Sequence, residues 1–178
     1  MSSTLKIGGV APDFDLPAVD GQRYSLSSFR DKKVVVVMFT CNHCPYVQAY
    51  ESRLIAIQRD YAKAGVALAA INSNDDVAFP EDNFENMVTR AKAKGYNFPY
   101  LHDEAQTVAQ AYGATVTPEI FVLDSQRRLR YHGRVDDNWK EPGKVKSPDL
   151  REALDALVKG QPAPKPETQA FGCTVKWK

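Results

Sequence analysis

An uninterrupted apolar run over residues 34–39 leads directly into the polar segment Thr40-Cys41-Asn42-His43-Cys44-Pro45. A continuous apolar run predicts a strand covered on both faces, which is typical of a sheet with parallel neighbours. After Pro45, apolar residues recur at spacings of three and four, which predicts an amphipathic helix ending near Gly65. Two cysteines therefore lie where a buried strand passes into a helix, and the chain is predicted to be an α/β protein.

The flanking sequence continues the alternation of strands and helices. Asp20-Gly21 predicts a hairpin turn between short strands at 11–16 and 23–26. Residues 66–72 predict a second buried strand, joined to the first by a right-handed crossover. A second hairpin is expected from 120–123 to 129–135. Helices are expected over about 82–94, around 108–112, and from an N-cap at Ser147 to a stop at Gly160.

Length and composition limit the classes of protein that remain. The 178 residues can bury one sizeable core, and we expect one domain over residues 1–160, with 161–178 as its proline-rich linker and C-terminal tail. A net charge of +1 gives no reason to expect nucleic acid or a membrane as partner. Residues 1–6 lack the pattern of a secretory signal, so a cytoplasmic location is expected.

The three cysteines are too few for a disulfide scaffold. A CxxC motif among alternating strands and helices indicates redox chemistry or metal binding. A closed zinc site needs four ligands, which Cys41, Cys44, Cys173 and either His102 or His132 could supply. Structural zinc motifs bring their ligands in local pairs, which this chain lacks, so no metal and no cofactor are expected. The acidic stretch 75–82 is expected to be a solvated loop and helix start.

With the CxxC at a strand–helix junction and Thr117-Pro118 just before a strand, the chain resembles the thioredoxin-fold superfamily. Ala11-Pro12-Asp13-Phe14 is similar to the opening of its peroxiredoxin-like branch, the alkyl hydroperoxide reductase, thiol-specific antioxidant and redoxin proteins. It also resembles the thiol-disulfide oxidoreductases of cytochrome maturation. The Cys-Asn-His-Cys centre resembles a thioredoxin-family subgroup of that branch. The resemblance implies a thioredoxin-like three-layer fold over residues 8–160, with a central mixed sheet flanked by helices and an N-terminal β-hairpin extension.

The position of the two cysteines predicts their roles. Cys41 is expected at the first helical turn, where unpaired N–H groups and the helix dipole lower a thiol's pKa. Cys44 is expected deeper in the helix, within reach of Cys41. Cys41 is thus predicted to be the nucleophile and Cys44 the resolving thiol, which exchange disulfides through a mixed disulfide with the substrate. His43, as an imidazolium, would stabilise the Cys41 thiolate and make the disulfide more oxidising; alternatively, it is a solvated residue with little effect.

Two further residues, Pro118 and Cys173, have alternative interpretations. Pro118 resembles the cis-proline that faces the CxxC in thioredoxin folds, where the preceding residue, Thr117, offers backbone groups to an extended substrate chain; the alternative is a trans proline starting an edge strand. Cys173 is either a third redox thiol on a tethered tail or a half-buried residue that packs the tail beside Trp177.

These residues predict a thiol-disulfide oxidoreductase that exchanges with protein thiols or disulfides, or with a thioredoxin-type reductant. The first alternative is a peroxiredoxin-like thiol peroxidase. Aligning Cys44 with a peroxidatic cysteine puts Cys41 and Val37 where threonine and proline belong, which removes groups that shape a peroxide pocket. Arg134 could supply charge near the thiolate, or pair with Asp136 or Asp137. The second alternative is a non-catalytic redox sensor or metal clip.

Overall fold

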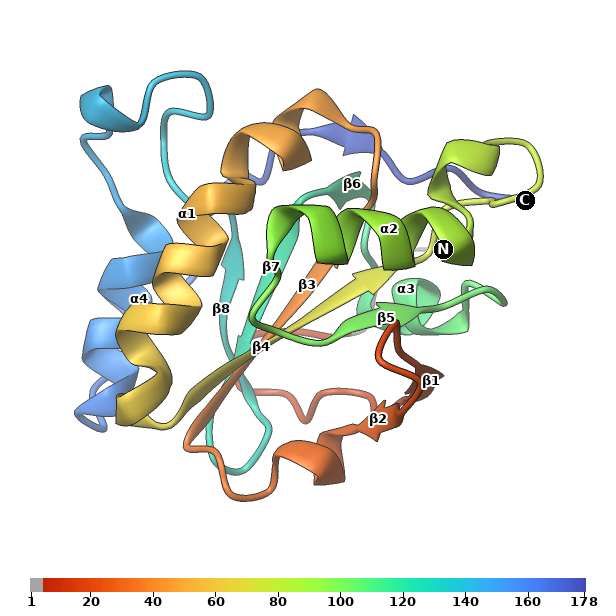
Figure 1. The fold of residues 1–178 in the computed structure, drawn as a ribbon. Helices are drawn as coiled ribbons and strands as arrows, with labels where there is room; N and C mark the ends of the chain where they lie inside the picture. Colours follow the sequence, from red (N-terminus) through yellow and green to blue (C-terminus); the bar gives the residue numbers. More distant parts are fainter. Residues whose placement is uncertain (1–4) are drawn as a thin grey trace.

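The computed structural model describes residues 5–178, so the part of the signal-peptide prediction that concerns residues 1–4 lies outside it. Its centre is a five-stranded sheet in the order β5-β4-β3-β7-β8 (Figure 1). The strands of this sheet are β3 (Val34–Thr40), β4 (Val66–Asn72), β5 (Tyr100–His102), β7 (Glu119–Leu123) and β8 (Leu129–Gly133). The β3–β4 and β4–β5 pairs are parallel, whereas β3–β7 and β7–β8 are antiparallel. The predicted mixed sheet is therefore confirmed.

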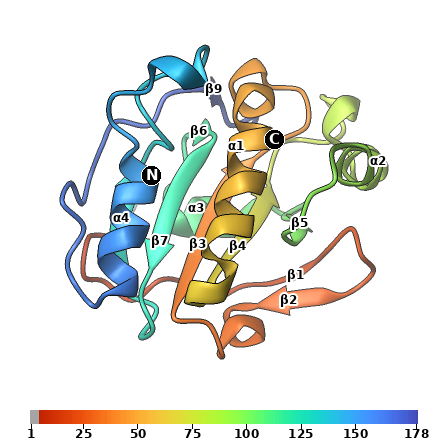
Figure 2. The ribbon, with the colours of Figure 1, turned by 60° about the vertical axis from the view of Figure 1, so that its left-hand side comes forward.

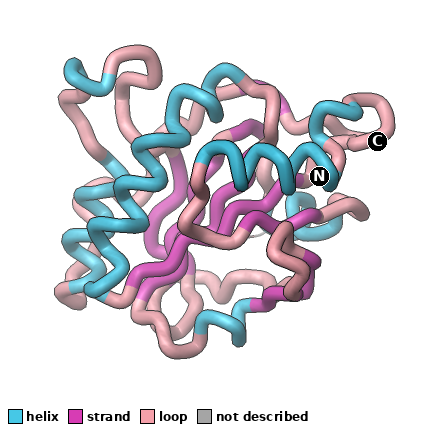
Figure 3. Tube along the Cα trace, in the orientation of Figure 1, coloured by secondary structure: helices cyan, strands magenta, loops and turns pink. Residues whose placement is uncertain are grey.

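Helices cover both faces of this sheet (Figures 2 and 3). The helices are α1 (Pro45–Tyr61), α2 (Phe84–Lys94), α3 (Thr107–Tyr112) and α4 (Asp149–Val158), with the short 3-10 turns η1 (Leu26–Phe29), η2 (Ala62–Ala64), η3 (Pro80–Asp82) and η4 (Pro142–Lys144). One core joins α1, α2 and α4 to one face of the sheet. The other joins α3 and the hairpin of β1 (Asp15–Pro17) and β2 (Arg23–Ser25) to the opposite face. This is the three-layer arrangement with an N-terminal hairpin that the sequence predicts.

The apolar run is buried on both sides for a simple reason. Side chains alternate along a strand, so Val34, Val36 and Met38 enter the core beneath α1, while Val35 and Phe39 enter the core beneath α3. Among residues 5–178, no helix is long and apolar enough to cross a bilayer.

The strand register gathers several loops at one edge of the sheet. Thr40, the last residue of β3, pairs with Asn72, the last residue of β4, and Asn72 pairs with His102, the last residue of β5. Parallel strands end at the same edge, so the segments that follow them lie side by side. Antiparallel β7 begins at this edge, where Glu119 pairs with Phe39. The residues just before β7 therefore also reach it.

The C-terminal tail crosses this edge. Its strand β9 (Cys173–Thr174) pairs antiparallel with β6 (Val116–Thr117), the two-residue strand before β7. Figures 1 and 2 both show β9 passing beside β6 at the start of α1. The tail is thus part of the packed structure, and its own residue Val175 is buried.

Candidate active site

The Cys41–Cys44 loop ends directly at the start of α1. Pro45 is the first helical residue and Cys44 is the N-cap, with extended backbone angles (φ −73°, ψ 127°). Proline suits this position because its φ is already helical and the N–H it lacks would have no partner there. The prediction that the first helical turn begins at Cys41 and contains Cys44 is therefore wrong, because both cysteines precede the first helical residue. Cys44, and not Cys41, lies where the unpaired N–H groups of the first turn converge.

The electrostatics of the two sulfurs follow from this placement. Interaction with the Cys41 thiol, with Cys173 and with the backbone N–H of Val47 favours the charged form of Cys44 and lowers its pKa despite its burial. The pKa of Cys41 is raised instead, because its thiol donates to Cys44, because it is buried and because Asp82 is negatively charged. The prediction of a lowered pKa at Cys41 is wrong. These opposite directions favour Cys44 over Cys41 as the thiol that ionises first.

This distribution of charge predicts a measurable titration. Reduced protein is expected to show the ultraviolet absorbance of a thiolate that appears at lower pH than for an ordinary thiol, which ionises near pH 8.5. The sign follows because hydrogen-bond donors stabilise the charged form. The low-pH step should be absent in Cys44→Ser and present in Cys173→Ala, although at higher pH since one donor is lost. A low-pH step that disappears in Cys41→Ser but persists in Cys44→Ser would contradict this description.

The segment before β7 faces both sulfurs. The Thr117–Pro118 peptide bond is cis, as the resemblance implied. As a thiol, Cys44 donates to the carbonyl oxygen of Thr117 at 3.5 Å, and the Thr117 hydroxyl oxygen lies 3.6 Å from Cys41 Sγ. Thr117 therefore contacts both members of the pair.

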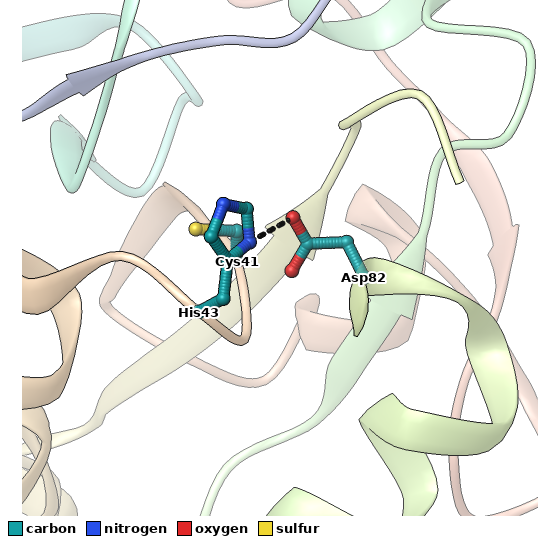
Figure 4. Close-up of side chains that lie close together, drawn as sticks. All are labelled: Cys41, His43 and Asp82. Atoms are coloured by element: carbon teal, nitrogen blue, oxygen red, sulfur yellow. Dashed lines mark ion pairs between the residues drawn. The ribbon is translucent and has the colours of Figure 1, made fainter. Parts of the chain in front are cut away.

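His43 is held by a buried carboxylate. Its Nδ1 lies 2.6 Å from Asp82 Oδ2, and Figure 4 shows the imidazole between the Cys41 sulfur and this carboxylate. The ring also stacks on Phe79, with 6.2 Å between centroids and 7° between planes. The His43 side chain is 32% exposed, whereas Asp82 is fully buried. His43 is thus fixed on one side and open to solvent on the other.

Asp82 is the functional candidate that sequence reasoning missed, because the acidic stretch 75–82 was expected to be solvated. Its Oδ1 accepts the Asn42 backbone N–H at 2.7 Å, and its Oδ2 accepts the Asn74 side-chain amide at 2.9 Å. Asn74 follows β4, so Asp82 joins the loop after β3 to the loop after β4. A signal was available: parallel β3 and β4 end at one edge, which brings an acidic loop after β4 close to the cysteines.

The site also brings together residue types that bind metals. Within residues 5–178, Cys41, His43 and Asp82 each offer a ligand atom, and these atoms lie within 4.8 Å of one another. The Asp82 oxygens already accept two hydrogen bonds, so hydrogen bonding accounts for the arrangement. The zinc set considered from the sequence is different: His102 lies 3.6 Å from Asp76, and His132 lies 2.5 Å from Glu119. Each of these two histidines has a carboxylate partner of its own.

Arg134 is engaged away from its predicted partners. It forms an ion pair with Asp149 at 2.6 Å, while Arg53 binds Asp136 at 2.9 Å. The prediction that Arg134 pairs with Asp136 or Asp137 is therefore wrong.

Comparison with known proteins identifies the family of the chain. Residues 7–132 match the AhpC/TSA family. The thiol-disulfide oxidoreductase ResA of Geobacillus thermodenitrificans is 29% identical over 130 residues, which are 72% of this chain and 69% of that protein. The crystal structure of the hypothetical protein SMc02350 from Sinorhizobium meliloti superposes with a TM-score of 0.91 at 43% identity, over 99% of this chain and 97% of the other.

A more distant structure confirms the fold that the resemblance implied. The thioredoxin domain of the thiol-disulfide oxidoreductase BVU-2223 from Bacteroides vulgatus superposes with a TM-score of 0.61 at 18% identity, over 71% of this chain and 86% of that domain. The fold is thioredoxin-like. The family match covers most of the chain, from the N-terminal hairpin through the dithiol and the cis-proline to β8. The chain belongs to the AhpC/TSA family.

Proposed function

We propose that this protein is a thiol-disulfide oxidoreductase that acts through the Cys41–Cys44 pair, with protein disulfides or thiols as substrates and a thioredoxin-type dithiol as its redox partner. One observation carries the proposal: Cys44, the N-cap of a helix, packs against a second thiol, Cys41, beside a cis-proline. A stabilised thiolate attacks, and a neighbouring thiol releases the product. The ResA relative supports the same class of reaction.

The geometry favours Cys44 as the attacking sulfur and Cys41 as the resolving one, the reverse of the order inferred from the sequence. The Cys44 thiolate attacks one sulfur of the substrate disulfide, whose S–S bond breaks and releases the first substrate thiolate. Cys41 then loses its proton and attacks Cys44 Sγ. This step forms the Cys41–Cys44 disulfide and releases the second substrate thiolate. Two electrons pass to the substrate, and the two product thiolates take one proton from Cys41 and one from water.

His43 and Asp82 serve the second step in this proposal. Cys41 must ionise before it can resolve the mixed disulfide, and its pKa is raised. Ligand atoms of His43 and Asp82 lie within 4.8 Å of its sulfur, and the imidazole is open to solvent on its far side. The pair is thus positioned to pass the Cys41 proton outward. We further propose a cytoplasmic location and a single domain over residues 1–160, with residues 161–178 as its tail.

The proposal is tested by turnover. With dithiothreitol as electron donor, the reduced protein is expected to accelerate the reduction of insulin disulfides well above the rate with dithiothreitol alone. The Cys41→Ser/Cys44→Ser double variant is the control and should give only the background rate. Wild-type protein that gives the background rate, although its dithiol is fully reduced, would contradict the proposal. That result would favour a non-catalytic sensor, or a metal clip if the protein contains zinc.

The second candidate function is a thiol peroxidase, and the low pKa of Cys44 favours it because peroxide also reacts with a thiolate. Cys44 also stands where the peroxidatic cysteine aligns. Against it, Cys41 and Val37 replace the threonine and proline of that motif, and Arg134 is engaged with Asp149. Rapid mixing of reduced protein with hydrogen peroxide separates the two functions. Thiol loss faster than that of free cysteine would favour the peroxidase.

A further inference from the structure

We infer that Cys173 is a third redox-active thiol, and that the segment carrying it is an internal substrate that forms a disulfide with Cys44. This inference rests on the proposed function, since it uses the same exchange chemistry. We call residues 168–178 the strap.

The strap lies where an extended substrate chain would bind. Its strand β9 pairs antiparallel with β6, so that Cys173 is opposite Thr117, the residue before the cis-proline. The N–H of Val175 also donates to the carbonyl of Thr115 at 2.9 Å. An extended peptide that adds to a strand edge uses the same backbone groups. The strap therefore already pairs with the edge of β6, and Cys173 is the strap residue that lies opposite Thr117.

Cys44 is the middle member of a group of three sulfurs. It accepts hydrogen bonds from the Cys41 thiol and also from the thiol and backbone N–H of Cys173. Burial and these interactions with Cys44 raise the pKa of Cys173 to about 11. The three side chains pack with Val47 in one cluster. Cys173 is thus placed against the sulfur that carries the thiolate, as the sulfur of a bound substrate would be.

The strap is held closely at both ends of this contact. At Gly172, an added Cβ would lie 1.9 Å from the Thr117 carbonyl oxygen, so only glycine permits this approach. Beyond β9, the Lys176 carbonyl accepts the N–H of Asp75 at 2.7 Å and the Gln106 amide at 2.9 Å. Cys41 is 1% exposed and Cys44 is fully buried. An external disulfide therefore reaches Cys44 only when residues 170–174 move aside.

The proposed exchange conserves electrons. Starting from the Cys41–Cys44 disulfide, the Cys173 thiolate attacks Cys44 Sγ. The Cys44–Cys173 bond forms, the Cys41–Cys44 bond breaks, and Cys41 leaves as a thiolate that takes up the proton given up by Cys173. The reverse step, attack by Cys41 on Cys44, repeats the resolution of a mixed disulfide. Cys41 and Cys173 thus compete for Cys44, and an external substrate competes with Cys173.

The test uses Cys41→Ser, which leaves Cys44 and Cys173 as the two cysteines, with oxidised glutathione as oxidant and mapping of the disulfides in unreduced digests. We expect an intramolecular Cys44–Cys173 disulfide with little retained glutathione. Gly172→Val should reduce its yield about tenfold, because the effective concentration of Cys173 at Cys44 falls. Gly143→Val is the matched control, since an added Cβ there meets nothing within 4 Å. It should leave the yield unchanged.

A stable glutathione adduct on Cys44 with Cys173 still free to react with maleimide would overturn the inference. Equal yields of the Cys44–Cys173 disulfide in Cys41→Ser protein with and without Gly172→Val would also overturn it. Mapping does not depend on insulin reduction. A protein that forms the Cys44–Cys173 bond without turnover would refute only the proposed function, and one with turnover but no such bond would refute only the role of Cys173.

Discussion

Cys44→Ser is expected to lower insulin reduction to the background rate without protein. Cys44 carries the thiolate at the N-cap of α1, and a serine hydroxyl stays protonated and does not attack disulfides at neutral pH. Cys41→Ser should also stop turnover, but at a later stage. The first attack remains possible in that variant, and the mixed disulfide then has no resolving thiol. The mixed disulfide with the substrate should therefore accumulate in Cys41→Ser and not in Cys44→Ser.

The trapped species is best observed in a Cys41→Ser/Cys173→Ser double variant, because Cys173 could otherwise displace the substrate from Cys44. Incubation with a peptide disulfide should give a stable adduct on Cys44, detected as an added mass that dithiothreitol removes. Cys44→Ser/Cys173→Ser is the matched control and should give little adduct. An adduct on Cys41 in this control, with none on Cys44 in the other variant, would restore the order of attack inferred from the sequence.

Asp82→Ala is expected to lower the free energy of unfolding by about 3–5 kcal/mol, the cost typical of removing one partner from a buried charged contact. Asp82 is fully buried, and its carboxylate accepts the Asn42 N–H and the Asn74 amide and contacts His43. Alanine would leave these buried polar groups without an acceptor, and each such group is costly. The loops after β3 and β4 would also lose the residue that joins them.

Urea unfolding of reduced protein measures this loss, which corresponds to a fall in Tm of roughly 10 °C for a chain of this size. Glu81→Ala is the matched control in the same turn, since the Glu81 side chain is exposed and its backbone carbonyl, which accepts the Asn42 amide, is retained. This control should change the free energy of unfolding by less than about 0.5 kcal/mol. Equal unfolding curves for the two variants would show that the Asp82 network contributes nothing to stability.

Much of the fold could be predicted because it depends on local patterns. The apolar run at 34–39 became β3, and the three- and four-residue spacings after Pro45 became α1. The hairpin of β7 and β8 and the N-terminal hairpin were also confirmed. In each case the period of the apolar residues matches the period of the element, and neighbours in sequence determine it. The cis-proline was correctly placed by resemblance.

The start of α1 shows where local reasoning stops. A CxxC spacing is compatible with a helix that begins at either cysteine, and the sequence favoured Cys41. Pro45 instead occupies the first helical position, which makes Cys44 the N-cap. This small change in where the helix begins exchanges the expected roles of the two sulfurs. The unpaired N–H groups of the first turn point toward the N-cap residue.

The sequence by itself therefore determined that the chain has a strand–dithiol–helix unit in an α/β fold and that its chemistry concerns thiols. Only the tertiary structure decided which donors and charges surround each sulfur. That decision depends on Asp82, which lies 40 residues after Asn42, and on Cys173, which β9 brings to Thr117. The pKa of a thiol reports the donors, charges and burial around it in space. Those surroundings exist only once distant segments of the chain have packed at the same edge of the sheet.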